Sequence, residues 1–126
     1  MSASNYLEDM VLNAISGNGS FVSGDIYIAL FTSNPTDSIS GIELSADSYQ
    51  RKLVTFGAAF SGSMTNNAEV LFDQATTDWG TVTGFGLYDQ FTNGNLLFYG
   101  SLSSPVVVNY GESLRFQSGT LTISLD

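Results

Sequence analysis

The sequence predicts a mainly β protein, an antiparallel β-sandwich of about eight strands with one amino-terminal amphipathic helix. Two observations support this prediction. Short runs of β-branched and aromatic residues alternate with turns rich in Gly, Asn, Asp and Ser along most of the 126 residues, which is typical of jelly-roll or immunoglobulin-like sandwiches. Helical spacing of apolar residues is found near the amino terminus. We expect a single domain over residues 1–126, with residues 1–17 as a docking helix and residues 25–126 as the sandwich.

An apolar stripe with the spacing i, i+3, i+4, i+7 and i+8 predicts the helix within residues 6–15. Ser4 or Asn5 precedes the stripe as an amino-terminal cap, and Gly17 follows it as a left-handed stop. Because about three turns of helix are marginal in isolation, we expect the stripe to cover an edge or end of the β core. The alternative is an arm that docks on a neighbouring subunit. The stripe consists of Leu7, Met10, Val11, Ala14 and Ile15, and the first three are candidate interaction residues.

Two strong strands flank a long loop in the first half of the chain. Residues 25–32 are apolar at successive positions and predict a strand buried on both faces. Residues 36–48 are polar and predict a loop with one short edge strand. Residues 49–56 predict the second strand, which carries Arg51. Since the chain has twelve acidic residues, we expect Arg51 to form an ion pair or to be a solvated charge at the rim of the protein; the alternative is an interface role on a carboxylate of this or another chain.

The stretch 78–89 holds the only tryptophan and predicts a turn that leads into a central strand. Trp79 is expected to anchor the core, and the alternative is an exposed aromatic that stacks on a sugar or a partner. Gly84 and Gly86 fall on one face of the strand, because side chains alternate between faces. We expect this glycine face to receive a bulky neighbour, either Trp79 or a tyrosine of an adjacent strand.

A hairpin is predicted after this strand, because Asn93-Gly94 readily adopts the positive φ angles of a tight turn. Residues 96–102 are therefore expected to pair with residues 85–89. Further strands are predicted at residues 105–108, 113–117 and 121–125. Alternation in the last two is expected to turn Leu114, Phe116, Leu121, Ile123 and Leu125 inward.

Composition excludes several classes of function. Twelve acidic and three basic residues give a net charge of −9, which repels phosphate backbones and anionic lipids, so we expect neither a nucleic acid nor a membrane partner. The sequence contains no Cys and no His. Disulfides, thiolate nucleophiles and the serine-histidine-acid arrangement are therefore excluded. We find no signal peptide and no apolar run approaching the roughly 20 residues of a transmembrane helix.

The acidic residues are scattered and suggest little chemistry, so no catalytic, cofactor or metal site is predicted. Asp78 and Asp89 form a carboxylate pair of the glycosidase type only if folding brings them face to face. Calcium binding by Asp37, Glu43 or Asp47 in the long loop is a further minor alternative. An enzyme is therefore less well supported than a structural or binding protein.

Six segments together resemble a family of small tailed-bacteriophage virion proteins often labelled "phage tail fibre protein". The resemblance covers nearly the whole chain and implies a structural protein of the virion, assembled in the cytoplasm of the bacterial host, without catalytic activity. The segments are residues 4–8 (SNYLE), 26–35 (IYIALFTSNP), 49–56 around YQR and VTF, 78–83 (DWGTVT), 94–100 (GNLLFYG) and 121–126 (LTISLD).

The place on the virion is inferred from size and pattern. A fibre shaft usually needs length or repeats, and this chain has neither. We therefore expect a decoration or cement protein that stabilises the exterior of the capsid by contacts with the major capsid protein, as a homo-oligomer for which a trimer is favoured. The alternative is a small tail fibre, collar or baseplate adaptor subunit that contacts other tail proteins.

Overall fold

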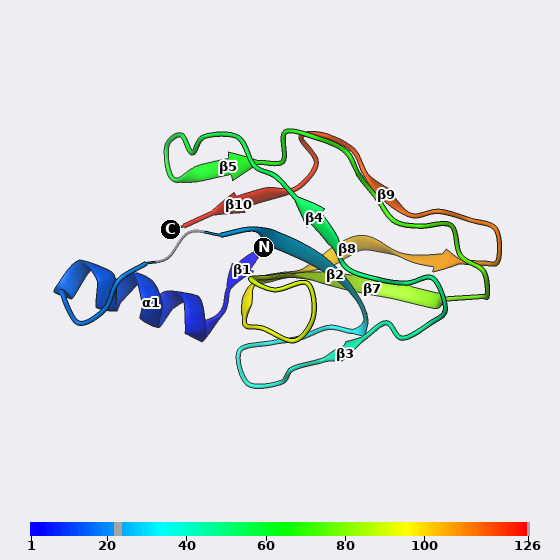
Figure 1. Ribbon diagram of the computed structural model, residues 1–126, viewed down its shortest axis with the longest axis horizontal. Helices are drawn as coiled ribbons and strands as arrows, with labels where there is room; N and C mark the ends of the chain where they lie inside the picture. The colour runs from blue at the N-terminus through cyan, green and yellow to red at the C-terminus, as the bar shows by residue number, and fades with distance from the viewer. Residues whose placement is uncertain (22–23, 126) are drawn as a thin grey trace.

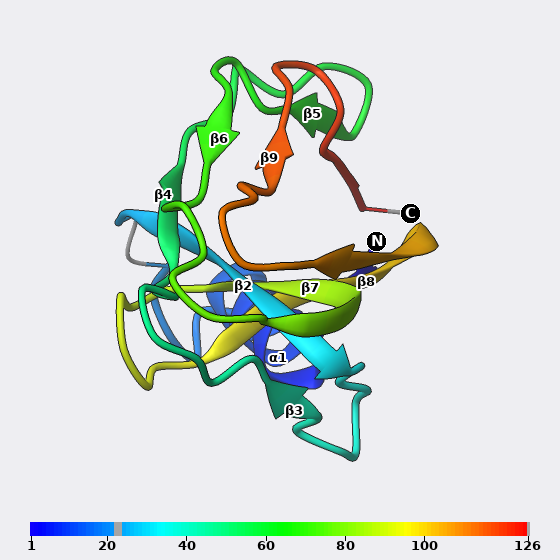
Figure 2. The same cartoon turned by 90° about the vertical axis from the view of Figure 1, so that its right-hand side faces the viewer.

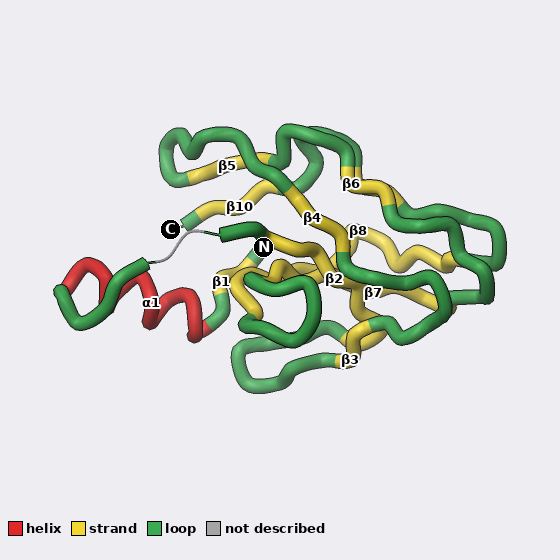
Figure 3. The backbone as a smooth tube through the Cα atoms, viewed as in Figure 1, coloured by secondary structure: helices red, strands yellow, loops and turns green. Residues whose placement is uncertain are grey.

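The structure is a computed structural model that describes residues 1–21 and 24–125. Asp126, the last residue of the resemblance, lies outside the described residues. Loops connect mostly short strands (Figure 3). In chain order the elements are β1 (Ser2–Ala3), α1 (Asn5–Ser16), β2 (Ile26–Ser33), β3 (Ile42–Glu43), β4 (Lys52–Val54), β5 (Ser63–Thr65), β6 (Val70–Leu71), β7 (Gly80–Tyr88), β8 (Leu96–Val108), β9 (Arg115–Phe116) and β10 (Thr122–Ser124).

The largest sheet is antiparallel and has the order β1-β8-β7-β2-β3, with β4 also paired to β2 (Figure 1). We call it the main sheet. The expected central position of β7 is confirmed, because it lies between β2 and β8. The prediction of a buried strand is also confirmed, since the middle of β2 is buried. Its pairing with β7 places Ile28 opposite Leu87 and Leu30 opposite Phe85, so these four side chains share one face.

Two short ladders, β5–β10 and β6–β9, lie over that face of the main sheet (Figure 2). Aromatic rings join the two layers: Phe116 of β9 lies edge-on to Phe85 at 5.8 Å and to Phe72 at 6.4 Å between ring centroids. Asn66 ties the ladders together, because its buried amide donates to the Gln117 carbonyl at 3.0 Å and accepts from the Leu121 N–H at 2.9 Å. The mainly β, antiparallel prediction is confirmed, while the ladders do not distinguish jelly-roll from immunoglobulin-like wiring.

The predicted pairing of the two strands is confirmed, with Tyr88 paired with Leu96 and positive φ angles of 56° at Asn93 and 77° at Gly94. The expected tight turn is wrong, because the connection between β7 and β8 spans residues 89–95. The separate strand expected at residues 105–108 is wrong, because these residues continue β8 beyond a bulge. There, residues 102–105 stand opposite the single Thr83 of β7, which bends the strand.

The alternation predicted for the last two strands is confirmed at most positions. Leu114, Leu121 and Ile123 are buried and Phe116 is half-buried. Leu125 is exposed instead of inward, because β10 ends at Ser124.

Helix α1 begins and ends as the sequence predicts. The Ser4 side chain caps it by accepting the Leu7 N–H at 3.2 Å, and Gly17 closes it with φ 80°. Leu7 is buried against the main sheet, but Ile15 is 79 % exposed. Figure 1 shows the reason: only the start of the helix reaches the sheet, and its far end projects beyond it. The expectation that the whole stripe covers the core is therefore wrong for Ile15.

Trp79 is 4 % exposed and belongs to the core. Its indole N–H donates to the Asp47 carbonyl at 3.1 Å, and its ring lies edge-on to Tyr49 at 5.7 Å. The predicted core role is confirmed, and the exposed alternative is wrong. Trp79 does not fill the glycine face of β7, because Asn34 covers Gly84, and Leu96 and Phe31 cover Gly86.

Candidate functional site

Arg51 is 7 % exposed and makes an ion pair within this chain. Its Nε donates to Glu43 Oε2 at 3.1 Å and its Nη2 to Oε1 at 2.9 Å, so the pair is bidentate. Its Nη1 donates to the carbonyls of Gln90 at 3.0 Å and Asn93 at 2.7 Å, and its Cζ lies 3.8 Å from the Tyr88 ring centroid. The expected ion pair is confirmed, and it links β3 to the turn between β7 and β8. The expectation of a solvated rim charge is wrong, because the Arg51 side chain is buried.

Tyr49 extends this set of contacts toward the core. Its hydroxyl donates to Glu43 Oε2 at 2.7 Å and accepts the Leu30 N–H at 3.0 Å. Burial raises the pKa of Tyr49 far above its usual value, and the hydrogen bond to Glu43 raises it further. Burial lowers the pKa of Arg51, but the hydrogen bond and charge of Glu43 outweigh burial, so the pKa of Arg51 is raised. We call Glu43, Tyr49, Arg51 and Tyr88 the arginine network.

Apart from Tyr49, whose ring packs against Phe72 and Trp79 of the core, the arginine network occupies the face of the main sheet that the ladders do not cover. On this face the missing side chain of Gly86 allows close packing. A Cβ atom there would lie 2.8 Å from Leu96 Cδ1 and 3.0 Å from Phe31 Cε2. The Phe31 ring in turn stacks on Tyr88, with 6.4 Å between centroids and 17° between planes. The prediction of a bulky neighbour is therefore confirmed at Gly86, but the choice of Trp79 or a tyrosine of an adjacent strand is wrong, because Leu96 and Phe31 fill this space, Tyr88 belongs to β7 itself, and Asn34 covers Gly84.

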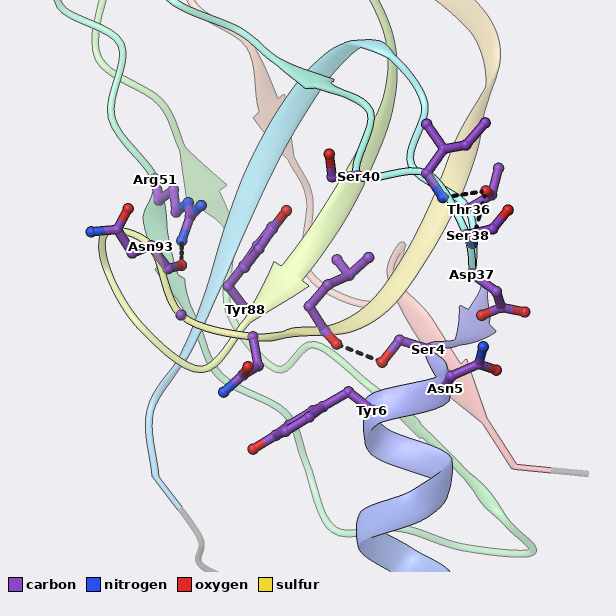
Figure 4. Close-up of a pocket in the computed structure, with 14 residues that line it drawn as sticks. Ser4, Asn5, Tyr6, Thr36, Asp37, Ser38, Ser40, Arg51, Tyr88 and Asn93 are labelled. Carbon is purple, nitrogen blue, oxygen red and sulfur yellow. Dashed lines mark hydrogen bonds between the residues drawn. The ribbon is translucent and has the colours of Figure 1, made fainter.

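An open hollow of about 450 Å³ lies beside the arginine network (Figure 4). Its walls come from residues 4–6 at the start of α1, residues 36–40 of the long loop and residues 93–96 of the hairpin, with Arg51 and Tyr88. In Figure 4, Asp37 and Ser38 lie across the hollow from Tyr88. Segments far apart in the sequence thus meet around one concave surface.

Hydrogen bonds fix two of the hollow's walls. The Ser4 hydroxyl donates to the Leu96 carbonyl at 2.5 Å, which joins the start of α1 to β8. Thr36 Oγ1 accepts the N–H groups of Ser38 at 3.3 Å and Ile39 at 3.1 Å, which shapes the loop. These bonds hold the Ser4 and Thr36 side chains in defined positions.

The outer surface of α1 is a second candidate site. Leu12 is 63 % exposed and Ile15 is 79 % exposed, and residues at i and i+3 lie on neighbouring positions of a helix surface. Met10 and Val11 are half-buried beside them. An exposed apolar pair at the end of a projecting helix is available for contact with another protein.

The described residues support neither a metal-binding site nor a membrane-spanning helix. Glu43 uses both carboxylate oxygens for Arg51 and Tyr49, and within residues 1–21 and 24–125 we find no group of three acidic side chains able to hold a metal ion. In the same part of the chain, no helix has the length and apolar character needed to cross a membrane.

Comparison with known families identifies the protein class. Residues 2–124 match the family described as Podophage GP4 fiber I protein gp80. The chain belongs to this family. It is therefore a non-enzymatic structural fibre protein of a phage virion, which confirms the resemblance, the location and the absence of catalytic activity. No curated protein matches the sequence.

The family changes the preferred position of this fibre protein on the virion. Its description names a fibre, so it supports the tail-fibre alternative and gives no support to capsid decoration. Of the residues selected from the sequence, Leu7 and Trp79 are buried, Met10 and Val11 are half-buried, and Arg51 belongs to the arginine network. Their contacts with other proteins stay predictions.

Sequence reasoning missed Glu43, Tyr88 and Tyr6 as members of these sites in the fibre protein. One signal was available: Tyr49 and Arg51 are two positions apart in an extended segment and therefore share a face. Two donors on one buried face require a nearby acceptor. Glu43 supplies it from a different strand, and sequence spacing alone does not identify that strand.

Proposed function

We propose that the protein is a small tail-fibre or adaptor subunit that attaches to other tail proteins through the outer surface of α1. The observation that carries this proposal is the exposed pair Leu12 and Ile15 at the end of a helix that projects from the main sheet. Helices of this kind commonly insert an apolar surface into a groove of a partner.

The base of α1 is held firmly enough to present such a surface. The Ser4 N–H donates to the Leu97 carbonyl at 2.8 Å and its hydroxyl to the Leu96 carbonyl. Leu7 is buried just after this anchor. A fixed base reduces the orientational freedom that binding must remove.

Charge defines the chemistry of the expected partner. The helix carries Glu8 and Asp9 and has no Lys or Arg, in a protein of net charge −9. We therefore expect an apolar groove with basic residues at its rim, because complementary charge speeds association and disfavours wrong partners. Repulsion between equal charges disfavours pairing of α1 with α1 of another copy.

A homo-oligomer, with a trimer favoured, remains part of the proposal. Closed symmetric assemblies are the usual form of homo-oligomers. Light scattering on the purified protein is expected to give about three times the protomer mass of 13.4 kDa. A monomer at micromolar concentration would remove this part of the proposal and leave tail attachment in place.

Attachment is tested with isolated tails and a double variant, Leu12→Gln with Ile15→Gln. We expect the wild-type protein to bind tails and the double variant to lose at least tenfold in affinity. The matched control is Phe60→Gln, which changes another exposed apolar side chain outside α1. Equal loss in the control, or binding to capsid shells but not to tails, would contradict the proposal.

Copy number gives an independent test. Quantitative mass spectrometry of purified virions is expected to show a small number of copies relative to the major capsid protein. A ratio near one, or a simple fraction of it, would instead support the capsid-decoration hypothesis.

A further inference from the structure

We propose that Asn18-Gly19 is a site of spontaneous chemical modification, and that the arginine network protects Asn93-Gly94 from the same reaction. These are the two Asn-Gly pairs of the sequence, and as dipeptides they are identical. A difference between their reaction rates in the folded protein therefore comes from the fold. This inference does not depend on the proposed function.

The reaction is the loss of the asparagine side-chain amide, and it consumes only water. The glycine backbone nitrogen attacks the asparagine Cγ and forms a bond with it, and the amide nitrogen leaves as ammonia together with the proton of the glycine N–H. Water then opens the five-membered imide at either carbonyl, which gives aspartate or isoaspartate. Glycine favours the attack because it has no side chain to hinder its nitrogen, and asparagine is among the thermolabile residues of proteins.

Asn18-Gly19 lies in an exposed segment just after α1, at the end of the helix that projects from the main sheet (Figure 1). The Asn18 N–H donates to the Asn13 carbonyl at 2.9 Å, so hydrogen bonding to the helix reaches as far as this nitrogen. Within the described part of the chain, the peptide that joins Asn18 to Gly19 makes no hydrogen bond to another residue. This peptide is therefore free to rotate and to bring the Gly19 nitrogen to Asn18 Cγ.

The surroundings of Asn18 offer little resistance to this rotation. Its side-chain Nδ2 donates to Ser16 Oγ at 2.9 Å, but both groups are exposed, so water can replace this bond at little cost. A Cβ atom on Gly19 would have Asn13 Cβ as its nearest neighbour, at 3.4 Å. Neither contact fixes the 18–19 peptide.

The corresponding peptide of Asn93-Gly94 is held by the arginine network. The Asn93 carbonyl accepts a hydrogen bond from Arg51 Nη1 at 2.7 Å (Figure 4). Arg51 is buried, and both carboxylate oxygens of Glu43 hold it in place. Because this carbonyl and the Gly94 nitrogen belong to one planar peptide unit, Arg51 also fixes the orientation of the nitrogen that would attack.

Ring closure requires the 93–94 peptide to turn away from this position. Asn93 has a φ of 56°, which is the left-handed conformation, with a ψ of about +47°. The imide ring instead requires the Gly94 nitrogen to eclipse the Cα–Cβ bond of Asn93, and for an L-residue this needs a negative ψ. The Asn93 carbonyl must therefore leave Arg51 before the ring can form.

Asp89 restricts the same turn from the other side. A Cβ atom on Gly94 would lie 2.6 Å from Asp89 Oδ1, so the space around this glycine is small. The two carboxylate oxygens of Asp89 accept the Asn95 N–H at 2.7 Å and the Asn95 side-chain Nδ2 at 3.1 Å. The Asn-Gly pair thus lies between two fixed points, Arg51 and Asp89.

Modification of Asn18 changes the connection between α1 and β2. Aspartate adds a negative charge to a protein of net charge −9, close to the carboxyl-terminal end of α1, where the helix dipole disfavours negative charge. Isoaspartate lengthens the main chain by one methylene group. Both products differ from the original protein in ways that can be measured without a partner.

The first experiment follows both sites while the purified full chain is kept in mildly alkaline buffer. Peptide mass spectrometry detects the gain of about one dalton when ammonia is lost and water is added, and isoaspartyl methyltransferase labels the isoaspartate product. We expect Asn18 to react at least tenfold faster than Asn93 in the folded protein. In denaturant we expect similar rates at the two sites, because the fold no longer distinguishes them.

Arg51→Met tests the protection directly. We expect this variant to accelerate modification of Asn93 at least fivefold and to leave the rate at Asn18 unchanged. Leu121→Ala is the control for lower overall stability, because it removes a buried side chain far from the connection between β7 and β8. Arg115→Met is the matched control that removes an exposed arginine. Both controls are expected to leave the rate at Asn93 close to that of wild type.

Three results would overturn the proposal: equal rates at the two sites in the folded protein, a faster reaction at Asn93, or equal acceleration at Asn93 by Arg51→Met and Leu121→Ala. Asn18→Gln assigns the fast reaction to its residue, because glutamine would have to form a larger ring and reacts slowly. We expect this variant to lose the fast gain of mass. A fast gain that persists in Asn18→Gln would show that another residue is modified.

Discussion

The two faces of the main sheet are built on different principles. One face is closed by the ladders and buries Ile28, Leu30 and Leu87 completely. The other face carries the arginine network and the open hollow. Apolar burial therefore stabilises the first face, whereas directed hydrogen bonds and one ion pair shape the second. The second face is packed only in part, because Phe31 is buried over Gly86 while the hollow beside the arginine network stays open.

The largest effect is expected on the closed face. Leu87→Ala removes a fully buried side chain and is expected to lower the free energy of unfolding by about 3 kcal/mol, because a cavity adds to the lost apolar transfer. Urea unfolding measures the change. The matched control is Leu53→Ala on β4, an exposed leucine for which we expect less than about 0.5 kcal/mol. Similar losses at both positions would contradict the comparison.

The arginine network is expected to rank second. Arg51→Met leaves Glu43 and two carbonyls without their donor, with an expected loss of about 2 kcal/mol. Partial solvent exposure of Glu43, at 29 %, screens the unpaired charge and keeps the loss below that of a fully buried pair. Hydrogen exchange in residues 90–95 is expected to accelerate at the same time.

The control for Arg51 is Arg115→Met, since its ion pair with Glu69 spans 3.9 Å between exposed groups and is expected to contribute less than about 0.5 kcal/mol. A double-mutant cycle with Glu43→Gln isolates the coupling at Arg51. Coupling energies that are equal at the two pairs would show that the arginine network is an ordinary surface ion pair.

Close packing on the open face is tested by Gly86→Ala. The added Cβ would meet Leu96 and Phe31 within 3.0 Å, so we expect a loss of about 1.5 kcal/mol from overpacking. The comparison variant is Gly24→Ala, where the added atom has no neighbour within 4 Å. Thermal unfolding of the two variants should differ accordingly, and equal midpoints would show that the open face tolerates an extra methyl group.

Tyr49 connects the two faces and predicts a pH dependence. Because its pKa is raised in the folded protein from an ordinary value of 10.0, the folded state keeps a proton that the unfolded chain releases. The contribution of the protonated Tyr49 hydroxyl to the free energy of unfolding is therefore complete below pH 10. Above pH 10 the free energy of unfolding declines by up to about 1.4 kcal/mol per pH unit. Denaturant unfolding between about pH 10 and 11 is expected to show a steeper decline in wild type than in Tyr49→Phe. If the free energy of unfolding fell equally steeply with pH in wild type and in Tyr49→Phe, the pH dependence would not come from Tyr49.

Local signals predicted much of the fold. The Asn93-Gly94 turn fixed the pairing of β7 with β8, and the Ser4 cap and Gly17 stop fixed the ends of α1. The exposure of Ile15 was not predictable from periodicity, because a stripe shows which side chains share a face but not how far the partner surface extends. The bulge in β8 opposite Thr83 could not be predicted for a similar reason, because it depends on how β8 pairs with β7.

The sites were harder to predict than the strands. Arg51 was identified as a paired cation, but its partner Glu43 comes from the segment expected to be mostly loop. The hollow combines the start of α1, the long loop and the hairpin, and their meeting depends on sheet order. A single sequence carries no direct signal for strand order, so the residues that share a concave surface remain unknown until the topology is available.

The attachment of α1 also determines how mechanical force passes through the molecule. One end of the helix follows β1, which pairs with β8, and the other end leads along the chain to β2. A pull on α1 is therefore transmitted to β8 and β2, the two strands that flank β7. On the β8 side this pull acts first on the two-residue pairing of β1 and on the Ser4 hydrogen bonds to Leu96 and Leu97, so these contacts set the force at which α1 separates from the main sheet.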